Sequence, residues 1–467
     1  MISALLFTNI IFGQGLVTKT VLSDKTPLSL GCGSQYLIEH LDHQHEGYQK
    51  QADNLIKEVS EMVQSQSRSS RSSDLIKIPV VFHILYNSAD ENLPDSVILD
   101  QLRIMNESFR RTNSDTTNTR TEFKNVVGDT KIEFELATVD PDGKPTNGTT
   151  RTSTSVTHFG GILPYSPGQN AQITKWVADS FTYNLFRITD DKLGGKTSWN
   201  PRAYLNVWIG DLRISEPNFS NFEEVVYLGL ATNPKGHKNW PDSVLPDFVV
   251  AEGALIHYVN VGSNNPNQFP APYQAFNNTA KTGKITVHEV GHYLGLRHIW
   301  GDGDCTKDDF IDDTPLSASN SNWQCQPAKN TCVDASGPDL PDMIENYMDY
   351  SSGDCQNSFT KQQGDVMREV YNKYRKAQPA VSSEELNSEM RFKAFPNPTT
   401  GDLNIGFLDY FEGKVDITIL NIQGRVIHSE SIESSKSFHL NIASEAGIYF
   451  VRLNTENSTT SFKVVKE

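Results

Sequence analysis

Hydrophobic and polar positions change their spacing along the chain, and these changes mark the elements that we expect. Apolar and β-branched residues run almost without a break over residues 76–85, which predicts a strand. Apolar residues follow a helical period over 97–110, and they alternate with polar ones over 132–137. Apolar runs at 204–209 and 249–259 predict two more strands. The pattern up to residue 288 therefore indicates a domain that mixes strands and helices.

The end of the chain has a different pattern. A Ser/Glu-rich stretch, which we interpret as a linker over 381–391, precedes short alternating runs that are separated by turn signals such as Asn421–Gly424. Regular short strands with turns are typical of an all-β sandwich, here expected over residues 392–467. A carbohydrate-binding module is one interpretation of this pattern. The strands are expected at 415–420, 425–429, 438–442, 449–453 and 460–465.

The beginning of the chain suits export and later cleavage. The apolar stretch from Ile2 to Phe12 is too short to span a bilayer, and it favours a signal peptide over residues 1–15. A buried strand is the alternative, since no Lys or Arg precedes the stretch. Residues 40–66 have helical spacing and end in a Ser/Arg-rich run at 65–74. Such a run predicts an exposed, flexible linker, which is where proteases cut.

Composition narrows the class of protein. The 467 residues leave room for two or three domains, and 57 acidic against 41 basic residues give a formal charge of −16. This acidic balance disfavours nucleic acid as a partner. The sequence has no uninterrupted apolar run of about 18 residues, so we expect no transmembrane helix.

The five cysteines divide into a cluster of four and a distant single residue, Cys32. Four clustered cysteines in an exported protein predict two disulfides, with three pairings open. A zinc site on the four cysteines is the alternative, but it lacks a close C-x-x-C pair. The cluster consists of Cys305, Cys325, Cys332 and Cys355.

The segment from His288 to His298 carries the clearest chemistry, H-E-x-x-H-x-x-G-x-x-H. On a helix, His288 and His292 lie on one face and can hold one metal ion. Gly295 is where the helix can end, because glycine tolerates the left-handed conformation, and His298 then completes a set of three nitrogens. Three protein ligands leave a fourth position open, which is typical of a catalytic zinc site. Glu289 lies beside the ligands as the candidate general base.

These residues resemble the metzincin zinc endopeptidases, whose methionine turn is matched by Met348 within residues 346–350. The run from Thr286 to Thr360 is similar to the pappalysin family, including its cytophagalysin and ulilysin-like members. The resemblance implies an α+β metzincin catalytic domain over 75–380, with a twisted mixed sheet, backing and active-site helices and an irregular lower subdomain. It also implies an endopeptidase that acts on proteins or peptides, and we expect a monomer.

The resemblance assigns roles to further residues. It pairs Cys305 with Cys332 and Cys325 with Cys355, and it places Met348 as an apolar floor under zinc. Tyr350 would hydrogen-bond the tetrahedral intermediate; a core tyrosine is the alternative. Residues 16–74 resemble a pro-segment in which Cys32 blocks zinc; an ordinary buried thiol is the alternative. Asp309, Asp312 and Thr314 match a calcium site, against the alternative of a solvated acidic loop.

Two further interpretations concern the secretion route and the substrate specificity. The Pro396-Asn397-Pro398 opening and the run 447–452 resemble the C-terminal sorting domain of the type IX secretion system, which implies passage through the periplasm to the surface or the medium. Asp354, next to Cys355, would wall the pocket for the residue after the scissile bond and favour Arg or Lys there. Gln356 is an alternative occupant that would leave the pocket neutral, and an Asp354 that merely faces solvent in a loop is the other alternative. A non-catalytic zinc adhesin and a zinc hydrolase of non-peptide substrates are the rival functions.

Overall fold

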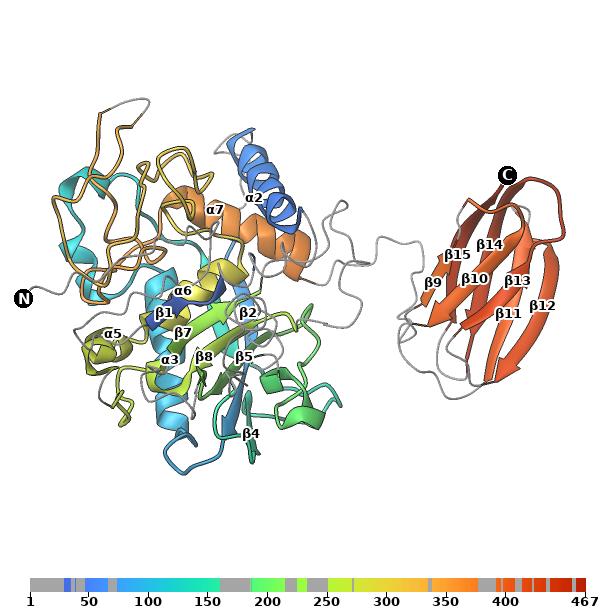
Figure 1. Ribbon diagram of the computed structural model, residues 1–467, viewed down its shortest axis with the longest axis horizontal. Coiled ribbons are helices and arrows are strands. Elements are labelled where there is room, and N and C mark those ends of the chain that lie inside the picture. Colours follow the sequence, from blue (N-terminus) through green and yellow to red (C-terminus); the bar gives the residue numbers. More distant parts are fainter. Residues whose placement is uncertain are drawn as a thin grey trace, which may run out of the picture. The chain divides into compact units, whose positions relative to one another are not determined.

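The structure is a computed structural model in which the chain forms two compact units, residues 1–377 and 378–467 (Figure 1). The predicted signal peptide (1–15), the Ser/Arg run at 66–73 and the linker at 381–391 lie outside the described residues. The described residues are 29–34, 38, 47–65, 74–159, 185, 187–214, 225–232, 251–270, 273–334, 338–376, 392–395, 398–407, 414–421, 424–433, 437–455 and 459–467.

The first unit is built on one mixed sheet with the strand order β1-β7-β8-β5-β2-β3, in which β4 also pairs with β2 and β6 with β7. Neighbouring strands are parallel except β7, which runs antiparallel to β8 and β6. The strands are β1 (Ser29–Cys32), β2 (Ile76–Tyr86), β3 (Ile132–Leu136), β4 (Thr149–Ser153), β5 (Leu205–Gly210), β6 (Arg213–Ile214), β7 (Val225–Ala231) and β8 (Ala254–His257).

One face of this sheet is covered by the helices that carry the site. Val80, Phe82 and Ile84 alternate along β2 and pack into the same core cluster as α3 and α6. Helix α7 continues into a π-helical turn at Tyr371–Arg375, and α2 packs along α7 (Figure 1). The helices are α2 (Tyr48–Ser65), α3 (Asp95–Phe109), α5 (Asn277–Ala280), α6 (Lys284–Tyr293) and α7 (Lys361–Val370).

The predicted strand at 249–259 is wrong in its length. Within the described residues its strand is β8, Ala254–His257, and the chain then turns into a 3₁₀ helix at Tyr258–Asn260. The side chain of His257 accepts a hydrogen bond from the backbone N–H of Val259 (3.3 Å) and so caps this turn. A side-chain cap of this kind ends a strand even where the apolar run continues.

The segment between α6 and α7 has little regular structure and is held by two disulfides. They join Cys305 to Cys332 and Cys325 to Cys355, with Cα atoms 5.7 and 5.9 Å apart. These are the expected pairings. The mixed sheet, the helices on its face and this irregular lower part confirm the predicted class of the catalytic domain.

The second unit consists of a three-stranded sheet, β13-β10-β9, and a four-stranded sheet, β12-β11-β14-β15. Leu403 and Ile405 of the first sheet share one core with Ile417 and Val451 of the second, which confirms an all-β domain. In the described part of the chain, no helix is long and apolar enough to cross a membrane. The strands are β9 (Phe392–Phe395), β10 (Asp402–Phe407), β11 (Lys414–Asn421), β12 (Val426–Glu433), β13 (Ser437–Asn441), β14 (Gly447–Asn454) and β15 (Thr459–Lys466).

Candidate active site

The centre of the site is helix α6, which is buried along its whole length against β7, β8 and α3. His288 and His292 lie one turn apart on it, so both rings point to the same side. Gly295 ends the helix with φ +91°, and the backbone N–H of Leu296 bonds back to the carbonyl of Gly291 (3.0 Å). This tight turn brings His298 back toward the other two rings.

Each histidine has its Nδ1 atom held by a hydrogen-bond acceptor. Nδ1 of His288 donates to the carbonyl of Tyr347 (2.6 Å), and Nδ1 of His292 donates to that of Leu296 (2.8 Å). Nδ1 of His298 is bonded to the carboxylate of Asp302. With Nδ1 occupied in this way, each Nε2 atom is left to act as a metal ligand.

The three Nε2 atoms converge on one point. Nε2 of His292 lies 3.1 Å from Nε2 of His288 and 3.1 Å from Nε2 of His298. Ligand nitrogens around a tetrahedral zinc ion, at about 2.0–2.1 Å each, stand about 3.3 Å apart, so the arrangement fits zinc. Burial lowers the pKa of His292 to about 3 and that of His288 well below its usual value, which keeps both rings neutral as ligands. Cys32 belongs to the same cluster, whose four ligand atoms lie within 4.8 Å of one another.

Asp302 orients the third ligand. It is buried beside His298 and also pairs with Arg297 (3.1 Å), and Arg297 in turn pairs with Asp53 on α2. Although burial acts to raise it, the pKa of Asp302 is held below its usual range by His298 and Arg297. The carboxylate is therefore ionised next to the imidazole.

Met348 lies beneath the ligand helix and does not ligate. A Cβ atom placed on Gly291 would come within 2.5 Å of Met348 Sδ, so the methionine fills the space that this glycine leaves on the helix. Met348 is fully buried, and its carbonyl accepts a hydrogen bond from the N–H of Ile299 (3.4 Å), next to the third histidine.

Glu289 is fully buried between α6 and the first strand of the chain. Its Oε2 atom accepts hydrogen bonds from Cys32 Sγ (3.2 Å) and from Ser34 Oγ (3.3 Å). Burial raises the pKa of Glu289 to about 8, and burial together with the Glu289 carboxylate raises the pKa of Cys32. Residues 32 and 34 thus contact the candidate base directly.

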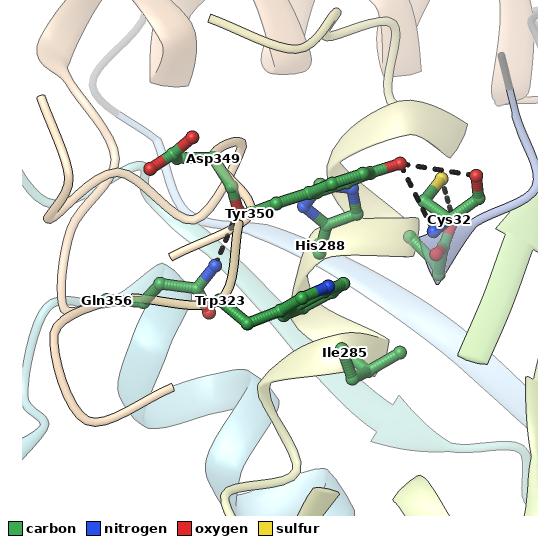
Figure 2. Close-up of a pocket in the computed structure, with 8 residues that line it drawn as sticks. Cys32, Ile285, His288, Trp323, Asp349, Tyr350 and Gln356 are labelled. Atoms are coloured by element: carbon green, nitrogen blue, oxygen red, sulfur yellow. Dashed lines mark hydrogen bonds between the residues drawn. The ribbon is translucent and has the colours of Figure 1, made fainter. Parts of the chain in front are cut away.

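A small cavity opens beside these groups (Figure 2). The hydroxyl of Tyr350 donates to the carbonyl of Cys32 (3.2 Å) and accepts from its N–H (3.1 Å), while its ring stacks on Trp323. Ile285 and Gln356 form other parts of the wall, as Figure 2 shows. The complete lining is Cys32, Ile285, His288, Glu289, Trp323, Asp349, Tyr350 and Gln356.

Asp354 and Gln356, the two residues expected as alternatives for the wall of the specificity pocket, differ in their placement. Asp354 is exposed and does not line the cavity, whereas the alternative residue, Gln356, is buried in the wall. The acid in the wall is Asp349, which is 1% exposed. Its Oδ1 accepts from the N–H of Ser321 (3.2 Å), and its Oδ2 accepts no hydrogen bond of ordinary geometry from the described residues.

The three candidate calcium ligands belong neither to the histidine cluster nor to the cavity lining, and they differ in burial. Asp309 is 3% exposed and accepts from Thr314 Oγ1 (3.0 Å), whereas Asp312 is exposed. The metal-binding group of His, Cys, Asp and Glu side chains found within the described residues is the one around His292.

Sequence reasoning missed Asp302, Ser34 and Asp349. A weak signal existed for Asp349, because it follows Met348 in the methionine turn. The signal for Ser34 was its position two residues after Cys32. In an extended segment, side chains at this spacing point to the same side.

Comparisons with known proteins agree with this geometry. The family described as pregnancy-associated plasma protein-A matches residues 188–372, and the family described as secretion system C-terminal sorting domain matches residues 393–467. A promirolysin mutant of Tannerella forsythia is 32% identical, with a TM-score of 0.54 over 74% of this chain and 95% of that one.

Extracellular metalloproteases of fungi are similar over a shorter stretch. That of Arthroderma benhamiae is 38% identical over 96 residues, which are 20% of this chain and 31% of the relative. That of Coccidioides posadasii is 35% identical over 115 residues, which are 25% and 37%. The chain thus spans about a third of the length of these curated relatives.

The fold and the site define a metzincin-type metalloprotease with a three-histidine zinc site. Within that class, the chain belongs to the pappalysin family. Its second unit is a secretion sorting domain, so the protein is secreted or displayed at the cell surface, as the sequence predicted.

Proposed function

We propose that this chain is the latent precursor of a secreted zinc endopeptidase that hydrolyses proteins or peptides. The observation that carries the proposal is the convergence of three Nε2 atoms, with that of His292 3.1 Å from each of the other two, beside the buried carboxylate of Glu289. When bound, zinc polarises the peptide carbonyl and lowers the pKa of its water toward about 7.

The chain's own groups carry the protons. A carboxylate oxygen of Glu289 takes the proton of the attacking water and delivers it to the leaving amine nitrogen. The hydroxyl of Tyr350, which faces the Cys32 backbone in the precursor, is positioned to donate a hydrogen bond to the developing oxyanion.

The test is Glu289→Ala in the full-length protein after activation, with casein as substrate. Peptide hydrolysis is expected to fall by about 10²–10⁴-fold, while bound zinc, measured by mass spectrometry, stays at one per chain. Full activity without Glu289 would overturn the assignment. The parent protein is also incubated with casein, with and without a zinc chelator. Digestion that the chelator stops would identify an endopeptidase and exclude both a non-catalytic adhesin and a hydrolase of non-peptide substrates.

Latency in this proposal rests on the segment around Cys32. Its thiol lies within the metal-binding cluster and contacts Glu289, and Ser34 occupies the same carboxylate oxygen. Strand β1 extends the sheet parallel to β7 and ends at Cys32, and Ser34 follows two residues later. The pro-segment contacts the base and would supply Cys32 as a further ligand of a bound zinc ion, and cleavage within residues 66–73 would begin its removal.

For specificity we propose Asp349, in place of Asp354, as the acid that favours Arg or Lys after the scissile bond. Burial raises the pKa of Asp349 to about 6, so the group is ionised at neutral pH, and Oδ2 is left to pair with a cation. Such a pocket would also accept the enzyme's own linker at Arg68 or Arg71.

A calcium ion near Asp309 is part of the same proposal. Burial, and then the charge of Asp308, raise the pKa of Asp309 well above its usual range, and a bound cation would offset that repulsion. Melting of the protein with a calcium chelator, followed by return of Ca²⁺ or Mg²⁺, tests it. Identical melting temperatures in all three conditions would contradict calcium binding.

We propose that the C-terminal unit directs the precursor to the type IX secretion machinery, which is its expected partner. Support comes from the match of residues 393–467 to the sorting-domain family and from the separate core of this unit.

A further inference from the structure

Lys284, the first residue of α6, makes an unusual set of contacts for a lysine. The residue is 9% exposed, and its Nζ atom uses three donors at once. It pairs with Asp115 Oδ2 (2.6 Å) and donates to the carbonyls of Gly353 (2.7 Å) and Gln356 (2.6 Å). Lysine is rarely buried unless it is paired, and here the charge has both an anion and two fixed dipoles.

The two carbonyls belong to the segment that follows the methionine turn, residues 351–356. Gly353 packs so closely on the residues before α6 that a Cβ atom there would come within 2.5 Å of Thr282 Oγ1. Cys355 is tied to Cys325, and the N–H of Asn357 bonds to the carbonyl of Glu345 (2.8 Å). Lys284 is thus the contact that joins this segment to the first turn of the ligand helix.

The segment matters for the site because Gln356 lines the cavity. Its Nε2 atom donates to the carbonyl of Asp349 (2.7 Å), so the side chain is held beside Asp349 in the wall (Figure 2). Ile285 is the residue next to Lys284 on α6. One lysine therefore fixes the backbone of Gln356 relative to the helix that holds His288 and Glu289.

We infer that Lys284 is a positioning residue for substrate specificity, which sets the distance between the cavity wall at Gln356 and the catalytic groups on α6. This inference rests on the proposed endopeptidase function. The hydrogen bonds of its ammonium group go to Asp115 and to the 353 and 356 carbonyls, and none goes to a metal ligand or to Glu289. The lysine therefore acts on which residue the cavity accepts and how tightly.

The test is Lys284→Met in the full-length protein, assayed after activation with a peptide library and with single peptides. We expect KM to rise about tenfold, roughly the loss of one hydrogen bond to a charged group, with kcat and zinc content close to the parent. The preference at the residue after the scissile bond should broaden. The matched control is Lys281→Met, an exposed lysine three residues earlier, which should behave like the parent.

Hydrogen exchange of the full-length protein gives a readout that does not need activity. Amide exchange over residues 352–357 should quicken in Lys284→Met and stay unchanged in the control. A folded variant with the parental KM, preference and exchange would overturn the inference. If the Lys284→Met variant does not fold, Gly353→Ala is tested instead, because its Cβ atom would move the same segment away from Thr282. A broadened preference after the scissile bond supports the inference, and an unchanged preference rejects it. An inactive parent would overturn the proposed function, and the exchange data would still decide whether Lys284 holds the segment.

Discussion

Replacing Asp302 with asparagine is expected to loosen zinc without removing any ligand. Asn keeps the size of the side chain and tolerates the left-handed backbone at this position, φ 58°, but it loses the charge beside His298 Nδ1. Loss of such a partner costs about 10–100-fold in metal affinity, or about 1.4–2.8 kcal/mol. Zinc retention against a graded series of chelators, read by metal analysis, measures this change.

The same substitution should affect the mature enzyme more than the precursor. In the precursor Arg297, whose side chain is 5% exposed, still pairs with Asp53 of α2 when Asp302 is gone. Without the pro-segment, Arg297 would have lost both acidic partners that the precursor gives it. Breaking a fully buried pair costs about 3–5 kcal/mol, which is the upper bound here because α2 no longer covers the guanidinium. Denaturant unfolding of both forms should therefore show the larger loss in the mature form.

Asp304→Asn is the matched control, because Asp304 is an exposed acid two residues along the same loop. The reasoning is refuted if Asp302→Asn holds zinc as tightly as the parent and this control. Equal losses of stability in precursor and mature enzyme would contradict the role given to Asp53.

Three further changes test other parts of the molecule. Cys32→Ala should make the uncut precursor cleave a fluorogenic peptide, and a variant as latent as the parent would place the block elsewhere in the pro-segment. Asp349→Asn should abolish a preference for Arg or Lys and raise the free energy of unfolding at pH 7 by up to about 3 kcal/mol, because the pKa of Asp349 is about 6 in the fold against 3.8. The stability that its protonated form contributes is complete below about pH 4 and lost as pH rises through 6, so the gap between variant and parent, measured by denaturant titration, should close on acidification; a constant gap would contradict this. Deletion of residues 392–467 should leave folding and peptide hydrolysis intact but stop export, and parental amounts of truncated protein in the medium would reject the sorting role.

The parts of the site that lie on one helix could be predicted from the sequence. The spacing of His288 and His292 fixes their common face, and Gly295 marks the turn that returns His298. The disulfide pairing was implied by resemblance, since spacing alone leaves three pairings open. Short-range periodicity and sequence motifs depend on neighbouring residues alone, so they can be interpreted without knowledge of the fold.

Contacts between distant segments could not be predicted in this way. Ser34 meets Glu289 because β1 joins the sheet beside β7, a pairing across about 200 residues that no periodicity shows. Asp354 and Asp349 are equally acidic in the sequence, but only the structure shows that Asp349 is buried beside Ser321 while Asp354 is exposed. From the sequence, Lys284 is expected to be an ordinary exposed lysine. Only the structure shows that its ammonium group is surrounded by Asp115 and the carbonyls of Gly353 and Gln356.

Helix α2 has a consequence for the timing of activation. Leu55, Val59 and Val63 of this helix share one core with the catalytic domain, so cutting the chain between residues 65 and 74 removes a tether and leaves those contacts in place. A short tether holds its partner at an effective concentration of the order of millimolar. Once it is cut, the inhibitory fragment dissociates only as the two pieces are diluted or the fragment is digested. Activity would therefore lag behind cleavage, and the lag would shorten as the volume into which the protein is released grows.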